Sequence, residues 1–161
     1  MGKKATKAVG NMYYDARCEA LKNNEAFSSR EGASEVLHIE RTRLANIELG
    51  NITPYPEEVK CMAKEYNMPE LCNAYCANEC PIGKGTVTEV RMDDFDRLSL
   101  MVLGSLQDID RIRESLIEIS EDGVIEENEM GQFNDIIDSL EKIATNAQAL
   151  KLWAEKNIRF E

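Results

Sequence analysis

Apolar residues recur at steps of three and four along most of the chain, which is the spacing of amphipathic helices. The pattern therefore predicts an all-α protein. In the amino-terminal half it predicts five short helices separated by turns. In the carboxyl-terminal half it predicts two longer helices that run antiparallel as a hairpin.

The stretch 29–50 has the pattern of two helices joined by a tight turn near 37–39. The second of these helices is expected over about Glu40 to Leu49, ending at Gly50, a residue that tolerates the left-handed conformation. The inward positions would be Ala33, Leu37, Ile39, Leu44 and Ile47. A helix-turn-helix of this kind can lay a polar face into a DNA major groove, and here that face would be Arg41, Thr42, Arg43 and Asn46.

Local signals place the starts of the neighbouring helices. Ser28 and Glu31 fit a capping box, in which each side chain satisfies a backbone amide of the other, so a helix should begin there. Pro54 and Pro56 are expected to open the fourth helix, and Pro69 stands in the first turn of the fifth.

The carboxyl-terminal half carries two long apolar stripes. Asp93 can cap the first long helix, and residues 121–124 would join it to the second. Its stripe would be Phe95, Leu98, Val102, Ser105, Ile109, Ile112, Leu116 and Ile119. The stripe of the second helix would be Phe133, Ile136, Leu140, Ile143, Ala147, Leu150 and Ala154. A lone hairpin covers only part of such stripes, so we expect two copies to pair as a homodimer through a four-helix bundle.

These patterns divide the chain into four parts. Residues 1–10 are expected to form a basic flexible arm, and residues 11–80 a helix-turn-helix domain that binds DNA. Residues 81–92 would be a linker, because Pro and Gly interrupt the helical pattern there. Residues 93–161 would form the acidic helical hairpin, which we interpret as the dimerisation module.

Charge is distributed unevenly along the 161 residues. The net charge is −11, yet residues 1–84 carry only −1 and residues 85–161 carry −10. A nearly neutral first half can face nucleic acid if its basic residues share one surface, whereas the acidic second half would repel it. No apolar run approaches the roughly 18 residues that cross a bilayer, and no secretory signal core follows the amino terminus. We therefore expect a cytoplasmic protein that does not enter a membrane.

The candidate chemistry is limited. His38 is the one histidine and lies in the expected turn, so no catalytic pair is expected, and the chain is not expected to be an enzyme or to hold a cofactor. Cys72, Cys76 and Cys80 recur every four residues, which leaves buried thiols, a metal site and a redox sensor as alternatives, with buried thiols favoured. The run 118–129 partly follows a calcium-binding loop, but an acidic hairpin turn explains it more simply.

Several of these residues together give a resemblance to a known family. Residues 11–78 resemble the lambda-repressor-like, or XRE-type, transcriptional regulators in the joint spacing of Ile39, Leu44, Ile47, Glu48, Gly50, Pro56 and Ala63. The resemblance implies a five-helix DNA-binding domain. It implies that Arg30 contacts a phosphate or braces the third helix. It also implies that Arg41, Thr42 and Asn46 face base edges and that Arg43 lies against the DNA backbone.

Two positions depart from the family pattern. His38 stands where a glycine with positive φ is usual, and Glu40 places a carboxylate at the start of the presumed recognition helix. Glu40 could cap that helix or accept a hydrogen bond from a cytosine amine. Two functions therefore stand. One is a repressor-like regulator bound to double-stranded DNA as a homodimer. The other is a protein-interaction or assembly module with a helix-turn-helix fold, whose acidic carboxyl-terminal half docks a protein partner and which does not bind DNA.

Overall fold

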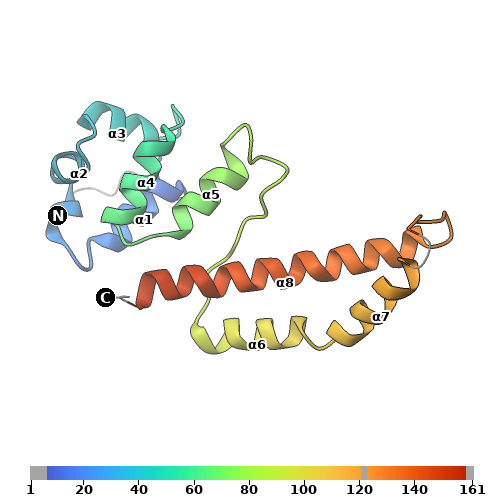
Figure 1. The fold of residues 1–161 in the computed structure, drawn as a ribbon. Coiled ribbons are helices and arrows are strands. Elements are labelled where there is room, and N and C mark those ends of the chain that lie inside the picture. The colour runs from blue at the N-terminus through green and yellow to red at the C-terminus, as the bar shows by residue number, and fades with distance from the viewer. Residues whose placement is uncertain (1–6, 121–122, 159–161) are drawn as a thin grey trace. The chain divides into compact units, whose positions relative to one another are not determined.

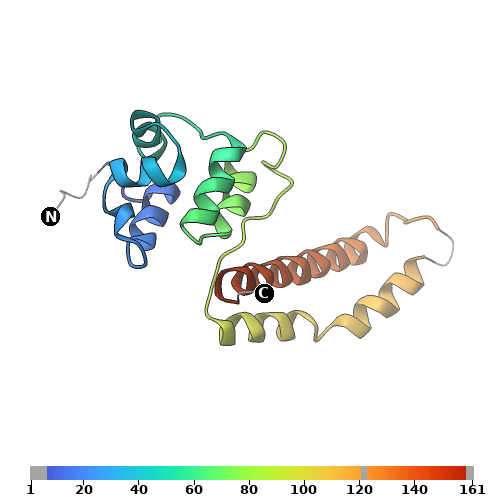
Figure 2. The same cartoon turned by 60° about the vertical axis from the view of Figure 1, so that its left-hand side comes forward.

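The computed structural model describes residues 7–120 and 123–158, and in this part of the chain it contains helices and no strand. The expected all-α class is confirmed. The chain divides between Glu89 and Val90 into two compact units, coloured blue to green and yellow to red in Figures 1 and 2. The division falls inside the expected linker 81–92. Within the described ranges, no helix is both long enough and apolar enough to cross a bilayer.

Unit 1 is built from short helices, as Figure 1 shows, and their buried side chains form one apolar core. Its helices are α1 (Met12–Ala20), the 3-10 helix η1 (Glu25–Ser28), α2 (Arg30–Leu37), α3 (Arg41–Glu48), α4 (Pro56–Glu65) and α5 (Glu70–Asn78). The five expected α-helices are all present, whereas η1 was not expected. All five inward positions of the 29–50 stretch are buried. Ala8 is fully buried as well, so the expected arm 1–10 is part of the fold from residue 7.

The capping box expected at Ser28 is wrong by one residue. Ser28 ends η1, and Ser29 instead caps α2 by accepting a hydrogen bond from the Gly32 amide at 3.1 Å. Both residues are serine, so the composition of the motif cannot choose between them. The choice follows from η1, whose last residue is Ser28, which leaves Ser29 with the extended backbone that a cap requires.

A buried ion cluster joins three helices of unit 1. Glu48, the last residue of α3, is fully buried and accepts from Arg17 of α1 at 2.6 Å and 3.0 Å. It also accepts from Nε of Arg30 of α2 at 2.7 Å. Arg17 donates further to the Phe27 carbonyl at 2.9 Å. Since a buried carboxylate needs charge-assisted partners, the cluster fixes how α1, α2 and α3 meet.

Removing this carboxylate should destabilise unit 1 strongly. Glu48→Ala is expected to lower the free energy of unfolding by about 3 to 5 kcal/mol, because Arg17 would keep a buried charge without its partner. Urea unfolding of the full chain followed by circular dichroism measures the loss. The matched control is Glu35→Ala on the exposed face of α2, which should change stability by less than about 0.5 kcal/mol. Equal small effects of the two substitutions would contradict the role of the cluster.

Unit 2 consists of α6 (Phe95–Ser105), α7 (Ile109–Ile119) and α8 (Met130–Asn157), and α8 runs back alongside the other two in Figure 1. The prediction of a single long helix from Asp93 is therefore wrong, because residues 106–108 separate α6 from α7. Ser105 turns its hydroxyl back to the Val102 carbonyl at 2.7 Å, and the chain continues with i to i+3 bonds before α7 begins. A hydroxyl that bonds the preceding turn weakens the helical ladder.

The two stripes are inward only in part. Asp94 precedes α6, while Asp93 forms an exposed ion pair with Arg97, so the expected Asp93 cap is not formed. On α8, Leu140 is 39% exposed and Ala147 is exposed, whereas Asn146, Ala149 and Leu152 are buried. Helices with 3.6 residues per turn rotate steadily away from a fixed stripe, so over the 28 residues of α8 the inward face changes. Residues 121 and 122 of the expected connection lie outside the described residues.

The cysteines and the acidic loop were the candidate metal sites. All five cysteines are free thiols of intermediate exposure, and Cys61, Cys72, Cys76 and Cys80 pack against the core of unit 1. In the described ranges, no group of three or more His, Cys, Asp or Glu side chains is placed to hold a metal ion. The run 118–129 includes residues 121 and 122, so the calcium-loop interpretation extends outside these ranges.

Candidate DNA-binding surface

The turn between α2 and α3 depends on a left-handed residue. His38 caps the carboxyl end of α2 with φ 53° and ψ 33°, the conformation that glycine adopts most easily. Ile39 follows and is buried, so its side chain anchors the turn to the core. After α3, Gly50 takes φ 72° and ends that helix. Only residues 38–40 separate α2 from α3, and the left-handed His38 and the buried Ile39 fix the conformation of this turn.

Glu40 caps α3. Its carboxylate accepts from the amides of Thr42 and Arg43, each at 2.9 Å, and these backbone hydrogen bonds lower the pKa of Glu40. Of the two roles considered for this residue, capping is the one that the structure contains. A helix amino terminus with free amides is an anion site. In α3 these amides are already used, so a DNA phosphate would have to be bound elsewhere.

The outer face of α3 carries polar side chains that belong to the expected site. Arg41 and Thr42 are exposed and Asn46 is partly exposed, while Leu44 and Ile47 on the opposite face are fully buried. Asn46 accepts a hydrogen bond from Asn51 at 3.0 Å, which orients its amide. At 100° per residue, Thr42 and Asn46 share one face and Arg41 lies to one side of it.

Arg43 is held inside unit 1. Its guanidinium donates to both oxygens of Glu58 at 2.5 Å and 2.8 Å and lies 4.3 Å from the centre of the Tyr55 ring. Glu58 also accepts from the Tyr55 amide at 2.7 Å. The hydrogen bond from Arg43 is the main cause of a lowered pKa of Glu58. The bidentate pair neutralises Arg43 and joins α3 to α4.

Arg30 is also engaged within the fold. Its Nε bonds Glu48 at the end of α3, and its side chain is only 25% exposed. The structure therefore contains the bracing contact, one of the two roles that the resemblance implied for Arg30. Of the five expected site residues, the structure brings Arg41, Thr42 and Asn46 to the outer face of α3, and it places Arg30 and Arg43 in ion pairs.

Sequence reasoning missed the partners of these arginines. Tyr55 and Glu58 lie more than ten positions after Arg43, too far along the chain for a local sequence pattern to link them to it. Arg17 has a local signal, because it follows Tyr13 by four positions on the buried side of α1, where an arginine needs an acidic partner. Tyr55 is 63% exposed beside Arg43, so it enlarges the surface around α3.

The fold and this surface define an all-helical chain with a tightly turned helix pair whose outer face is polar. The chain matches no protein-family model, and no match was found among the curated proteins or the solved structures.

The Arg43 and Glu58 pair should make stability depend on pH. The pKa of Glu58 is lower in the folded chain than its unfolded value of roughly 4.3. Its contribution is therefore present above that value and is lost as pH falls through the folded pKa. Between about pH 6 and pH 3, the wild type should lose more unfolding free energy than Glu58→Gln, by about 1 kcal/mol.

Urea unfolding at several pH values measures this difference. Glu57→Gln is the matched control, because Glu57 is the exposed neighbour in the first turn of α4. Its pH profile should follow that of the wild type. Parallel profiles for wild type and Glu58→Gln would show that the pair does not stabilise unit 1.

Proposed function

We propose that this chain is a sequence-specific, repressor-like transcriptional regulator that binds double-stranded DNA through α3. In this proposal α1 to α5 form a lambda-repressor-like domain, and the protein acts in the cytoplasm as a homodimer joined through unit 2. The exposed polar face of α3, backed by the fully buried Leu44 and Ile47, is the observation that carries the proposal. A helix fixed in this way can enter a major groove without unfolding any part of its own domain.

The roles differ from residue to residue. Thr42 and Asn46 would contact base edges from the middle of the face, and Arg41 would read a guanine or bind a phosphate from its side. Arg30 and Arg43 would act as positioning residues, because their guanidinium groups hold α3 against α2 and α4. Sequence would then be read by few side chains, with the domain supplying their orientation.

A second function is favoured by the charges and apolar side chains around α3. Glu40 covers the amides of the helix start, and Arg43 is neutralised by Glu58. Leu49 and Ile52 are each 37% exposed just after the helix, beside the exposed Tyr55. Such a surface suits a protein partner, and in that case the chain would be an assembly module that does not bind DNA.

The salt dependence of binding separates the two functions. Each phosphate neutralised on duplex DNA contributes a slope of about −0.9 to the plot of log K against log salt. With Arg41 as the unpaired arginine of α3, we expect a slope of about −1 per subunit and about −2 for a dimer. Fluorescence anisotropy with a labelled duplex selected from a random library measures it. No binding, or binding that salt leaves unchanged, would favour the protein-partner function.

Arg41 is the most informative single substitution. Arg41→Ala is expected to weaken binding to the selected duplex by about 1 to 3 kcal/mol and to relax the preference at one base position. Lys22→Ala is the control, because it removes the same charge from an exposed site after α1. Lys22→Ala should leave affinity nearly unchanged. An unchanged affinity for Arg41→Ala would remove Arg41 from the binding surface.

A further inference from the structure

The two sides of the line where α7 meets α8 differ in chemistry. Along that line Ile112 and Ile119 of α7 pack against Ile136 of α8, and Phe133 and Ile143 lie against this cluster. An antiparallel helix pair has two open sides beside its contact line. In an isolated pair both sides face water, so polar residues are expected on each of them.

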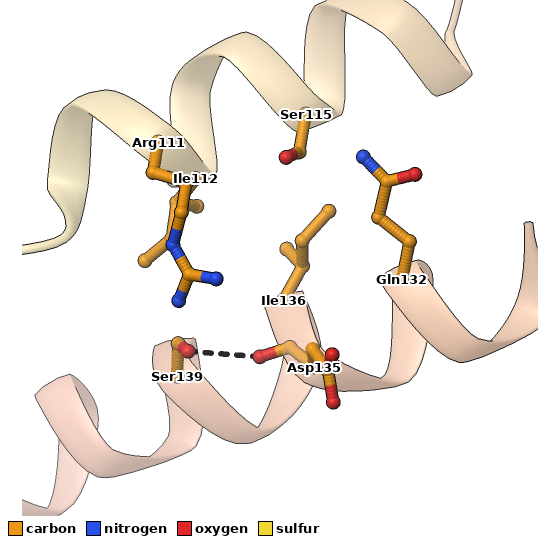
Figure 3. A pocket seen from close by; sticks show the side chains of 7 residues that line it. All are labelled: Arg111, Ile112, Ser115, Gln132, Asp135, Ile136 and Ser139. Carbon is orange, nitrogen blue, oxygen red and sulfur yellow. Dashed lines mark hydrogen bonds between the residues drawn. The ribbon is translucent and has the colours of Figure 1, made fainter.

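One side follows that expectation. A small pocket there is lined by Arg111, Ser115, Gln132, Asp135 and Ser139 together with Ile112 and Ile136, as Figure 3 shows. Ser139 uses its hydroxyl on the Asp135 carbonyl at 2.8 Å. The side chains that flank the contact line on this side are therefore hydrophilic on both helices. We call this the polar side.

The opposite side is apolar. Residues advance by 100° along a helix, so the residues that flank the contact line away from the pocket are Ile109 and Leu116 on α7 and Ile137 and Leu140 on α8. They are 43%, 37%, 39% and 39% exposed. The stripe continues along α8 with Ala144 and Ala147, which are exposed and small enough to allow another helix to approach closely. We call this the apolar side.

Two charged residues lie on the part of the apolar side where α7 and α8 run together, and they have opposite signs. With the same spacing of 100° per residue, Arg113 of α7 and Glu141 of α8 lie on the apolar side, and both are exposed. Arg113 lies 3.3 Å from Asp110 in an exposed contact, which is weak. A surface with apolar residues and one charge of each sign complements a copy of itself rotated by a two-fold axis.

We propose that a second copy of this chain docks on the apolar side, so that α7 and α8 of the two copies form a four-helix bundle. In that arrangement α7 of each copy lies against α8 of the other, and Arg113 approaches Glu141 of the partner subunit. The charges of Arg113 and Glu141 cancel on this face. Two copies of the acidic unit 2 can therefore meet there without strong repulsion. The inference rests on the proposed function in its pairing of two copies through unit 2, and it adds the face on which they pair.

The area of the apolar side sets the expected affinity between the two copies. Where α7 and α8 run together the face is about 16 Å long and about 20 Å wide. This is of the order of half the area that a standard interface buries on each partner, roughly 800 Å². The expected dimer is therefore reversible, with a dissociation constant in the micromolar range.

Sedimentation equilibrium of the full chain without DNA, in reducing buffer, tests the proposal from about 1 to 100 µM. The wild type should change from monomer to dimer over this range. Ala144→Glu should remain monomeric, because it puts a charge among the apolar residues of this side. Gln132→Glu adds the same charge to the same helix on the polar side and should dimerise like the wild type. Both positions are exposed, so both variants should keep the wild-type circular dichroism spectrum.

A charge exchange tests the identity of the partner. Arg113→Glu and Glu141→Arg should each weaken the dimer by about tenfold, and the double variant should recover most of the loss, because each new carboxylate would meet a new arginine on the other copy. A wild type that is monomeric at every concentration, an Ala144→Glu protein that still dimerises, or a double variant no stronger than the single variants would overturn the proposal. Because DNA is absent, this result is independent of whether α3 binds a duplex.

Discussion

The buried carboxylate of Glu48 is the interaction on which the arrangement of unit 1 depends. It ends α3, receives hydrogen bonds from Arg17 of α1 and Arg30 of α2, and is fully buried. Asn11 adds a bond from the start of α1 to the Ile47 carbonyl at 3.1 Å. Since a carboxylate buried without partners is very unfavourable, other orientations of α3 are disfavoured. The hydrogen bonds of Glu48, at the carboxyl end of α3, therefore determine the direction in which the outer face of this helix points.

The same arginines that would serve DNA binding are used to build the domain. Arg30 braces α3 through Glu48, and Arg43 joins α3 to α4 through Glu58 while Tyr55 covers its guanidinium. This leaves Arg41, Thr42 and Asn46 as the side chains that the proposed function asks to contact a duplex. Electrostatic attraction would then be modest for each subunit, and pairing of two subunits would add affinity that one subunit lacks.

Much of unit 1 could be predicted from the sequence, because its signals are local. The apolar spacing placed α1 to α5, and the glycine at position 50 marked the end of α3. The ion pairs could not be predicted in this way, since Arg43 and Glu58 lie on different helices and meet only after folding. In unit 2 the apolar rhythm continued through 106–108, so it concealed the break between α6 and α7. A repeat of apolar residues indicates which positions are buried, but it does not indicate whether the helical backbone hydrogen bonds continue without a break.

The most direct test of the central claim is to map which residues respond when DNA is added. In two-dimensional amide NMR of the uniformly labelled chain, titration with a duplex selected from a random library should shift the resonances of Arg41, Thr42, Asn46 and their neighbours in α3. The resonances of α7 and α8 should stay in place when the protein is already dimeric. Shifts confined to other parts of the chain, or no shifts at concentrations well above those of nonspecific binding, would contradict α3 as the surface that reads DNA.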